Sequence, residues 1–372
     1  MTLETWINQE LERRKNKNIF RELTSSSGLT DFYSNDYLGL ARSEKLFDLI
    51  NQRLEALNIK KNGATGSRLL SGNSTYVEEV EQKLSFVFKS PATLILNSGY
   101  SANLAVFSAI PQKGDTLLLD ELAHASIKDG ARLSLAKRFS FRHNDLNDLE
   151  AKIKRSAGKI FIGVESIYSM DGDECPLLEL ASLAKKYEAS IILDEAHSTG
   201  VNGLYGSGLA TSLGLENEIA IRLYTFGKAM GVHGACVSAS ANVVQYLINF
   251  ARPFIYTTAL SPHSIASIDC AFGYLRDNIS LQGELLQNVN LFLAHTEKDE
   301  NRKQSHSAIQ TIMRPGNENV KRAASIIQEA GFDVRPIVSP TVPVGSERLR
   351  ICIHSFNTPA EIVKLTSELK KI

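Results

Sequence analysis

Six short runs of apolar residues recur between residues 92 and 240, without strict alternation of apolar and polar positions. Strands that are covered on both faces show this pattern. The predicted strands are residues 92–97, 115–120, 159–166, 190–196, 220–226 and 235–240, and helical spacing of apolar residues predicts helices over 75–88, 102–110 and 176–187. Strand, helix and strand at this spacing predict an α/β fold with a doubly wound, mostly parallel sheet, in which ligands bind at the carboxyl ends of the strands.

The chain changes character after about residue 275. Residues 291–307 are polar and charged, which is typical of a solvated segment. Beyond them the pattern predicts strand, helix, strand, strand and helix, over residues 307–315, 317–332, 333–338, 348–355 and 359–371. We therefore expect an N-terminal segment (1–39) whose helix packs with the small domain, a large domain (40–275) and a smaller α+β domain (276–372).

Composition narrows the class of partner. The 372 residues are 43% hydrophobic, and 41 basic residues balance 41 acidic ones, so nothing indicates nucleic acid or a membrane surface as a partner. The four cysteines are far apart and form no C-x-x-C pair, so no zinc site, other metal site or disulfide framework is expected. The charged N-terminal helix has no long apolar core, and no run is long enough to span a bilayer. We expect a cytoplasmic protein that acts on small molecules.

One lysine, Lys228, follows an apolar run and is flanked by small residues that let a ligand approach the backbone. Asp194 ends another apolar run and His197 lies three residues beyond it, so the three side chains can face one crevice. This set suits pyridoxal 5'-phosphate: the lysine binds it covalently, the carboxylate keeps the ring nitrogen protonated and the imidazole bonds the ring oxygen. The alternatives are a solvated turn for Lys228, a helix N-cap for Asp194, and a capping or core histidine for His197.

Two further stretches fit the same cofactor. Ser98, Gly99 and Tyr100 follow a strand and open a helix, where backbone N–H groups and the helix dipole can hold a phosphate. His124 follows the next strand and can lie against a ring or move protons. An ordinary N-cap and a surface histidine are the alternatives. The glycines of residues 62–72 do not make a dinucleotide loop, because the third glycine is missing and the preceding residues read as helix.

Five ordered motifs together resemble the α-oxoamine synthases, and the resemblance runs from about residue 30 to residue 355. The motifs are "NDYLGLA", "DELAHASIKDGARLS", "YSMDGD", "DEAHSTGVNG" and "TFGKAMGVHGA". The resemblance implies a fold-type-I pyridoxal-phosphate transferase, which condenses an amino acid with an acyl-CoA and releases carbon dioxide. It also implies a homodimer with a shared active site.

The resemblance assigns roles to individual residues. It implies that Lys228 carries the cofactor, that Asp194 pairs with the ring nitrogen and that His197 bonds the ring oxygen. His124 is implied to stack on the ring, and Arg350 to bind the amino-acid carboxylate, for which a rigid bidentate donor is suited; a surface arginine is the alternative. The other implied cofactor contacts are Ser98, Gly99, Tyr100, Ser169 and Thr225, with Thr257 from the neighbouring subunit. The other implied substrate contacts are Arg21, Asn35 and Thr341.

Within the family, the likeness is greatest to the member that joins L-alanine to a pimeloyl thioester in biotin biosynthesis, where Arg21 would meet the far carboxylate. Members that use glycine with acetyl-CoA, or serine with a long-chain acyl-CoA, share the cofactor residues, so the choice of substrates stays open. Two more distant possibilities are an aminotransferase and a non-catalytic subunit of the same fold. His124 in place of an aromatic ring argues against an aminotransferase, and Lys228 argues against a non-catalytic subunit.

Overall fold

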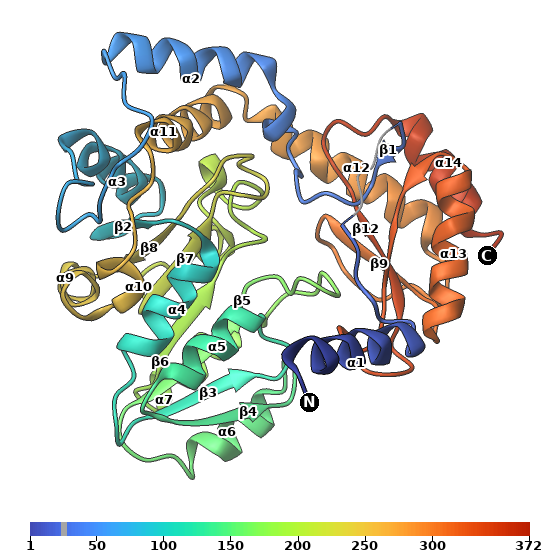
Figure 1. Cartoon of the computed structure of the whole chain (residues 1–372), viewed down its shortest axis with the longest axis horizontal. Coiled ribbons are helices and arrows are strands. Elements are labelled where there is room, and N and C mark those ends of the chain that lie inside the picture. Colours follow the sequence, from blue (N-terminus) through green and yellow to red (C-terminus); the bar gives the residue numbers. More distant parts are fainter. Residues whose placement is uncertain (24–27) are drawn as a thin grey trace. The chain divides into compact units, whose positions relative to one another are not determined.

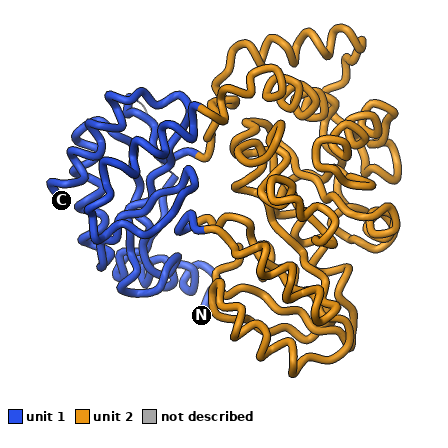
Figure 2. The backbone as a smooth tube through the Cα atoms, turned by 180° about the vertical axis from the view of Figure 1, so that it is seen from behind, with its two compact units in different colours: residues 1–34, 170–173, 284–372 blue, residues 35–169, 174–283 orange. Residues whose placement is uncertain are grey.

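The computed structural model describes residues 1–23 and 28–372. The chain forms two compact units, which Figure 2 shows in different colours. Unit 1 consists of Met1–Ser34, Met170–Asp173 and Glu284–Ile372, and unit 2 of Asn35–Ser169 and Glu174–Gly283. The division into domains at residues 39/40 and 275/276 stays a prediction.

Unit 2 contains a seven-stranded sheet with the strand order β2-β8-β7-β6-β5-β3-β4. The strands are β2 (Ala92–Leu96), β3 (Thr116–Asp120), β4 (Lys137–Phe141), β5 (Ile160–Glu165), β6 (Ser190–Asp194), β7 (Ile221–Thr225) and β8 (Ala235–Ala239). Only β8 runs antiparallel to its neighbours, so the prediction of a mostly parallel sheet is confirmed. Strand β4 was not predicted, because four of its five residues are exposed and it has no apolar run.

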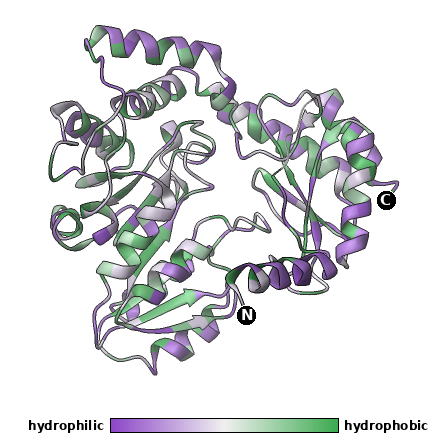
Figure 3. Ribbon diagram, in the orientation of Figure 1, coloured by the Kyte–Doolittle hydropathy of each residue, from purple (hydrophilic) through white to green (hydrophobic). Residues whose placement is uncertain are grey.

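Helices cover both faces of this sheet. Successive residues of a strand point to opposite faces, and on β3 the side chains of Leu117 and Leu119 join one apolar cluster while Leu118 joins another. The helices of unit 2 are α2 (Glu44–Ala56), α3 (Thr75–Val87), α4 (Gly99–Ala109), α5 (Ala125–Leu133), α6 (Leu146–Ile153), α7 (Leu177–Lys186), α8 (Leu209–Ser212), α9 (Ala241–Phe250), α10 (Arg252–Ile255) and α11 (Pro262–Asp277). Much of the sheet is coloured as hydrophobic in Figure 3 because both faces are buried.

Unit 1 is an α+β unit around a three-stranded antiparallel sheet with the order β11-β12-β9. Its elements are α1 (Leu3–Asn16), β1 (Thr30–Asp31), β9 (Ile309–Met313), α13 (Asn317–Glu329), β10 (Phe332–Asp333), β11 (Arg335–Ile337), β12 (Arg348–Cys352) and α14 (Pro359–Leu369). Strand β1 pairs in parallel with β10, and α12 (Ser280–Thr296) crosses the boundary between the units along the chain. Helix α1 buries none of its residues and is mostly hydrophilic in Figure 3.

The prediction of a solvated segment over residues 291–307 was wrong for its first part. Helix α12 continues to Thr296 and buries Val289, Phe292 and Thr296, which are three and four residues apart and so share one helical face. The charged residues that follow hid this face in the sequence. None of the helices in the described residues combines the length and hydropathy that crossing a bilayer requires.

Candidate functional site

A cavity of about 270 Å³ opens in unit 2 where the strands of the large sheet end. Its lining residues are Asn35, Ser98, Gly99, Tyr100, Asn103, His124, Ser126, Glu165, Asp194, Ala196, Thr225, Gly227, Lys228, His233 and Gly234. Most of them stand at or just beyond the carboxyl ends of β2, β3, β5, β6 and β7, whose positions in the sheet can be followed in Figure 1. Because these strands run in the same direction, their ends meet at one edge, as the sequence predicted.

Lys228 lies on the tight connection between β7 and β8. Backbone hydrogen bonds close this loop: the N–H of Phe226 donates to Gly234 O at 3.0 Å, and the N–H of Gly231 donates to Lys228 O at 2.8 Å. Gly231 has φ = 66°, and a Cβ there would overlap the backbone nitrogen of Ala41. The loop therefore requires glycine at this position and holds the lysine at a fixed place in the cavity.

The side chain of Lys228 meets His197, and a chain of hydrogen bonds continues from there. Lys228 Nζ lies 2.7 Å from His197 Nε2, and His197 Nδ1 lies 2.8 Å from the hydroxyl of Tyr37. That hydroxyl donates to Asn35 Oδ1 at 3.1 Å. His197 is buried, as the core-histidine alternative predicts. It also contacts Lys228, as the cofactor interpretation predicts, so the two interpretations are compatible.

Asp194 ends β6 and is 5% exposed. Its Oδ2 accepts a hydrogen bond from Asn103 Nδ2 at 2.7 Å, and its Oδ1 accepts one from the N–H of Ala196 at 2.8 Å. The second bond is the local backbone contact that the N-cap alternative predicts, but the carboxylate also lines the cavity. A carboxylate fixed in this way can accept one further hydrogen bond from a protonated ring nitrogen.

His124 and Glu165 form a pair beside Asp194. The backbone N–H of His124 donates to Glu165 Oε1 at 2.6 Å, and His124 Nδ1 lies 2.7 Å from Ser126 Oγ. His124 is exposed at the cavity, as the surface-histidine alternative predicts. Desolvation by the surrounding protein lowers the pKa of its imidazole, which the charge of Asp194 opposes and that of Lys228 reinforces. Burial, and then the charge of Asp194, raise the pKa of Glu165 to about 8. At neutral pH the cavity thus holds a neutral imidazole and a protonated carboxylic acid.

The start of α4 offers a place for a phosphate. Ser98 caps this helix by accepting from the N–H of Ser101, while the N–H groups of Gly99 and Tyr100 lie in the first turn, where the helix itself provides no acceptor. Facing them, the hydroxyl of Thr225 is buried and has no hydrogen-bond partner among the described residues. An unpaired buried hydroxyl beside a helix N-terminus fits a phosphate ester. Together with the amine and carboxylate, these groups fit pyridoxal phosphate.

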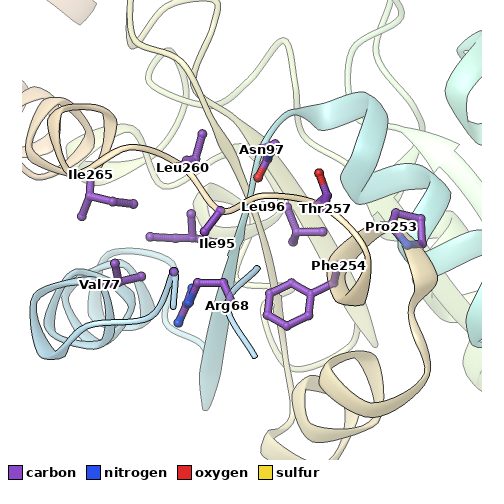
Figure 4. A pocket seen from close by; sticks show the side chains of 12 residues that line it. Arg68, Val77, Ile95, Leu96, Asn97, Pro253, Phe254, Thr257, Leu260 and Ile265 are labelled. Atoms are coloured by element: carbon purple, nitrogen blue, oxygen red, sulfur yellow. The ribbon is translucent and has the colours of Figure 1, made fainter. Parts of the chain in front are cut away.

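Some predicted cofactor residues of unit 2 do not line this cavity. Ser169 and His197 are not among its lining residues, although His197 contacts Lys228. Thr257 lines a separate small cleft with Arg68, Asn97 and Phe254, as Figure 4 shows. Thr257 was expected to act in the neighbouring subunit rather than in its own. The roles of these three residues therefore stay predictions.

Three predicted substrate residues belong to unit 1. Arg21 Nη2 donates to the hydroxyl of Thr341 at 3.4 Å, so these two lie together. Arg350 is on β12, is only 6% exposed, and its Nη1 lies 3.0 Å from Cys352 Sγ. It is therefore not the surface arginine of the alternative interpretation.

The structure adds residues that the sequence interpretation missed. Glu165 ends an apolar strand just as Asp194 does, so the same signal was present in the sequence. Asn103 is a buried polar residue within a mostly apolar helix, and such a residue gives no indication of its partner. His233 was part of the motif around Lys228, and Tyr37 part of "NDYLGLA", without either being singled out.

The chain is similar to known proteins over nearly its whole length. The model of the family described as aminotransferase class I and II matches residues 27–369. The chain is 39% identical to the 8-amino-7-oxononanoate synthase of Emericella nidulans, covering 96% of this chain and 92% of the relative. Among solved structures, it is similar to a serine palmitoyltransferase from S. paucimobilis (TM-score 0.89, 26% identity, 100% and 98% covered) and to the 8-amino-7-oxononanoate synthase of Francisella tularensis (0.80, 28%, 93% and 98%). The chain belongs to the aminotransferase class I and II family and is a pyridoxal-phosphate-dependent enzyme.

Proposed function

We propose that this enzyme joins L-alanine to a pimeloyl thioester, with loss of carbon dioxide and thiol, to give 8-amino-7-oxononanoate. The reaction type is inferred from Lys228, Asp194 and His124, which line one cavity. The choice of substrates rests on the relatives with that name, which reach 39% identity over nearly the whole chain. This places the reaction in biotin biosynthesis.

Each residue of the cavity has its own role in the proposed reaction. Pyridoxal phosphate, when bound, supplies an electron sink for the bonds that break at the α-carbon of the amino acid. Asp194 would hold a proton on the ring nitrogen of the bound cofactor. Lys228 would hold the cofactor, and its amine would take the α-proton of the amino acid.

His124 acts at the other substrate. Its lowered pKa leaves the imidazole neutral at neutral pH, so it can donate one N–H to the thioester oxygen while the α-carbon attacks. Glu165 fixes the backbone of His124 by accepting its N–H. Arg350 would bind the amino-acid carboxylate, and Arg21 with Thr341 would meet the far carboxylate of the pimeloyl chain.

A serine palmitoyltransferase-like reaction is the second candidate. The solved structures with that name are similar over the whole chain, with TM-scores up to 0.91. Their identities of 24% to 27% are lower than the 39% of the 8-amino-7-oxononanoate synthase relative, which favours L-alanine and the shorter acyl chain. The cavity residues serve both reactions, so they do not separate the two.

We further propose that the enzyme works in the cytoplasm as a homodimer, in which Thr257 of one subunit reaches the cofactor phosphate of the other. The support is that Thr257 lies in a cleft of its own rather than beside Lys228 in the same chain. Its substrates are small molecules.

The test is thiol release, measured across a grid of amino acids and acyl-CoAs with pyridoxal phosphate present. We expect release with L-alanine and pimeloyl-CoA, with 8-amino-7-oxononanoate identified by mass spectrometry. Lys228→Ala is the control that subtracts thiols of the protein itself, and it should lose turnover completely. Release only with serine and a long-chain acyl-CoA would support the second candidate instead. Keto-acid-dependent amino transfer without thiol release would contradict both.

A further inference from the structure

The hydrogen-bond chain Asn35–Tyr37–His197–Lys228 has a direction. The hydroxyl of Tyr37 carries one proton, and that proton is donated to Asn35 Oδ1 at 3.1 Å. Towards His197 Nδ1, 2.8 Å away, the same oxygen can then only accept. This direction points to a proton on His197 Nδ1.

The other side of the ring agrees with this assignment. A neutral imidazole protonated at Nδ1 has a lone pair at Nε2, and Lys228 Nζ lies 2.7 Å from that atom. A lysine ammonium has donors and no acceptor, so it requires such a lone pair. With the opposite tautomer, Nε2–H would face the N–H groups of the lysine and Nδ1 would have no donor from Tyr37. Only one tautomer satisfies all three contacts.

Tyr37 and His197 are shielded from water. Tyr37 is 1% exposed and His197 is 5% exposed, so water competes little for these bonds. The titratable groups that line the cavity beside Lys228 are Tyr100, His124, Glu165, Asp194 and His233, whereas Tyr37 and His197 are not among its lining residues. The adjacent Glu195 is engaged elsewhere, because it accepts from the N–H groups of Leu209 and Ala210. His197 Nε2 thus lies within hydrogen-bond distance of the lysine nitrogen, at 2.7 Å.

We infer that Tyr37 is a positioning residue for cofactor loading, which holds His197 so that its Nε2 takes one proton from the ammonium of Lys228. The imidazole becomes an imidazolium whose Nδ1–H is stabilised by the oxygen of Tyr37. The lone pair left on Nζ then forms the bond to the aldehyde carbon of pyridoxal phosphate. The aldehyde oxygen leaves as water with the two remaining Nζ protons. This step precedes turnover and does not depend on which thioester the enzyme uses.

The experiment measures the rate at which cofactor-free full-length protein binds pyridoxal phosphate covalently, by absorbance and by borohydride trapping at Lys228. In Tyr37→Phe the imidazolium loses its acceptor, so loading should slow about tenfold near pH 7. Near pH 10, about the ordinary pKa of a lysine, the amine is freed by solvent, and the two rates should converge. Tyr187→Phe is the matched control, because it removes a hydroxyl that donates to Glu150 at 2.7 Å, and Tyr187 does not line the cavity.

The pH profile separates positioning from a general structural defect. A loss by the same factor at every pH, or no loss near pH 7, would overturn the inference. Asn35→Ala should behave like Tyr37→Phe in a weaker form, and it provides the test if Tyr37→Phe does not fold. The tautomer is also directly measurable in the wild-type protein, because ¹⁵N shifts of the His197 ring distinguish Nδ1–H from Nε2–H. Protonation at Nε2 in the cofactor-free protein would contradict the proposal by itself.

Discussion

At the residue scale, Glu165 and Asp194 show how two similar sequence signals lead to different states. Both carboxylates end buried strands and line the same cavity. Asp194 accepts two hydrogen bonds, one of them from the Asn103 amide, whereas Glu165 accepts one and is repelled by the charge of Asp194. The apolar pattern predicts the position of both groups at strand ends. It does not predict the neighbours that decide which of them keeps a proton.

The protonated state of Glu165 makes stability depend on pH. Its pKa of about 8 lies above the ordinary value of 4.5, so between these values the folded cofactor-free protein binds more protons than the unfolded chain. The free energy of unfolding must then fall as the pH rises through this window, by up to about 1.4 kcal/mol per pH unit from this group. In Glu165→Gln, which keeps an acceptor for the His124 N–H, that part of the slope should vanish.

Urea unfolding of the cofactor-free protein at about pH 5.5 and 8, within that window, measures this slope at one protein concentration. The comparison between wild type and Glu165→Gln removes the contribution of the titrating groups that do not interact with Glu165. Equal slopes in the two proteins would show that Glu165 is already ionised at pH 5.5 in the folded state.

The site residues that could not be predicted are those whose partners are far away in the sequence. Lys228, Asp194 and His124 could be predicted because each follows a buried strand, and strand ends meet at one edge of a parallel sheet. Tyr37 contacts His197 across 160 positions, and Asn103 reaches Asp194 across 91. No local pattern encodes such a pair, since it arises only when the helix and strands are packed.

At the scale of elements, the apolar pattern predicts the strands whose two faces are buried, but it does not predict the exposed strand at the edge of the sheet. The six predicted strands of the large sheet match β2, β3, β5, β6, β7 and β8. Strand β4 lies at the edge of the sheet with residues that are largely exposed, so it has no apolar run to reveal it. Helix α12 was not predicted, and its last residues were assigned to the solvated segment because charged residues follow it directly.

The junction between α4 and β7 is the element contact on which the phosphate site depends. A Cβ on Gly99 would overlap the methyl group of Thr225, so Gly99→Ala should push the start of α4 away from the end of β7. We expect the dissociation constant for pyridoxal phosphate to rise about tenfold or more, because the N–H groups and the hydroxyl would no longer meet at one point.

Fluorescence titration of the cofactor-free protein with pyridoxal phosphate measures this effect. Gly273→Ala, in α11, is the matched control because an added Cβ meets no atom within 4 Å there. A Gly99→Ala protein with unchanged affinity would show that the first turn of α4 does not hold the phosphate.

At the scale of the whole molecule, the proposed sharing of Thr257 predicts complementation between two defective proteins. Lys228→Ala keeps Thr257 but cannot bind the cofactor covalently, and Thr257→Ala keeps Lys228 but should bind the phosphate weakly. If the two residues of one site come from different subunits, a mixed dimer has one intact site.

Random exchange of subunits should then restore about a quarter of wild-type turnover at limiting cofactor. Half of the dimers are mixed, and each mixed dimer has one intact site of two. If both residues served the same chain's site, mixing would leave activity at the mean of the two separate proteins, and the interpretation of Thr257 as a partner's residue would be wrong. Sedimentation of the mixture under assay conditions shows whether dimers are present, and an active monomer would exclude a site built from two subunits.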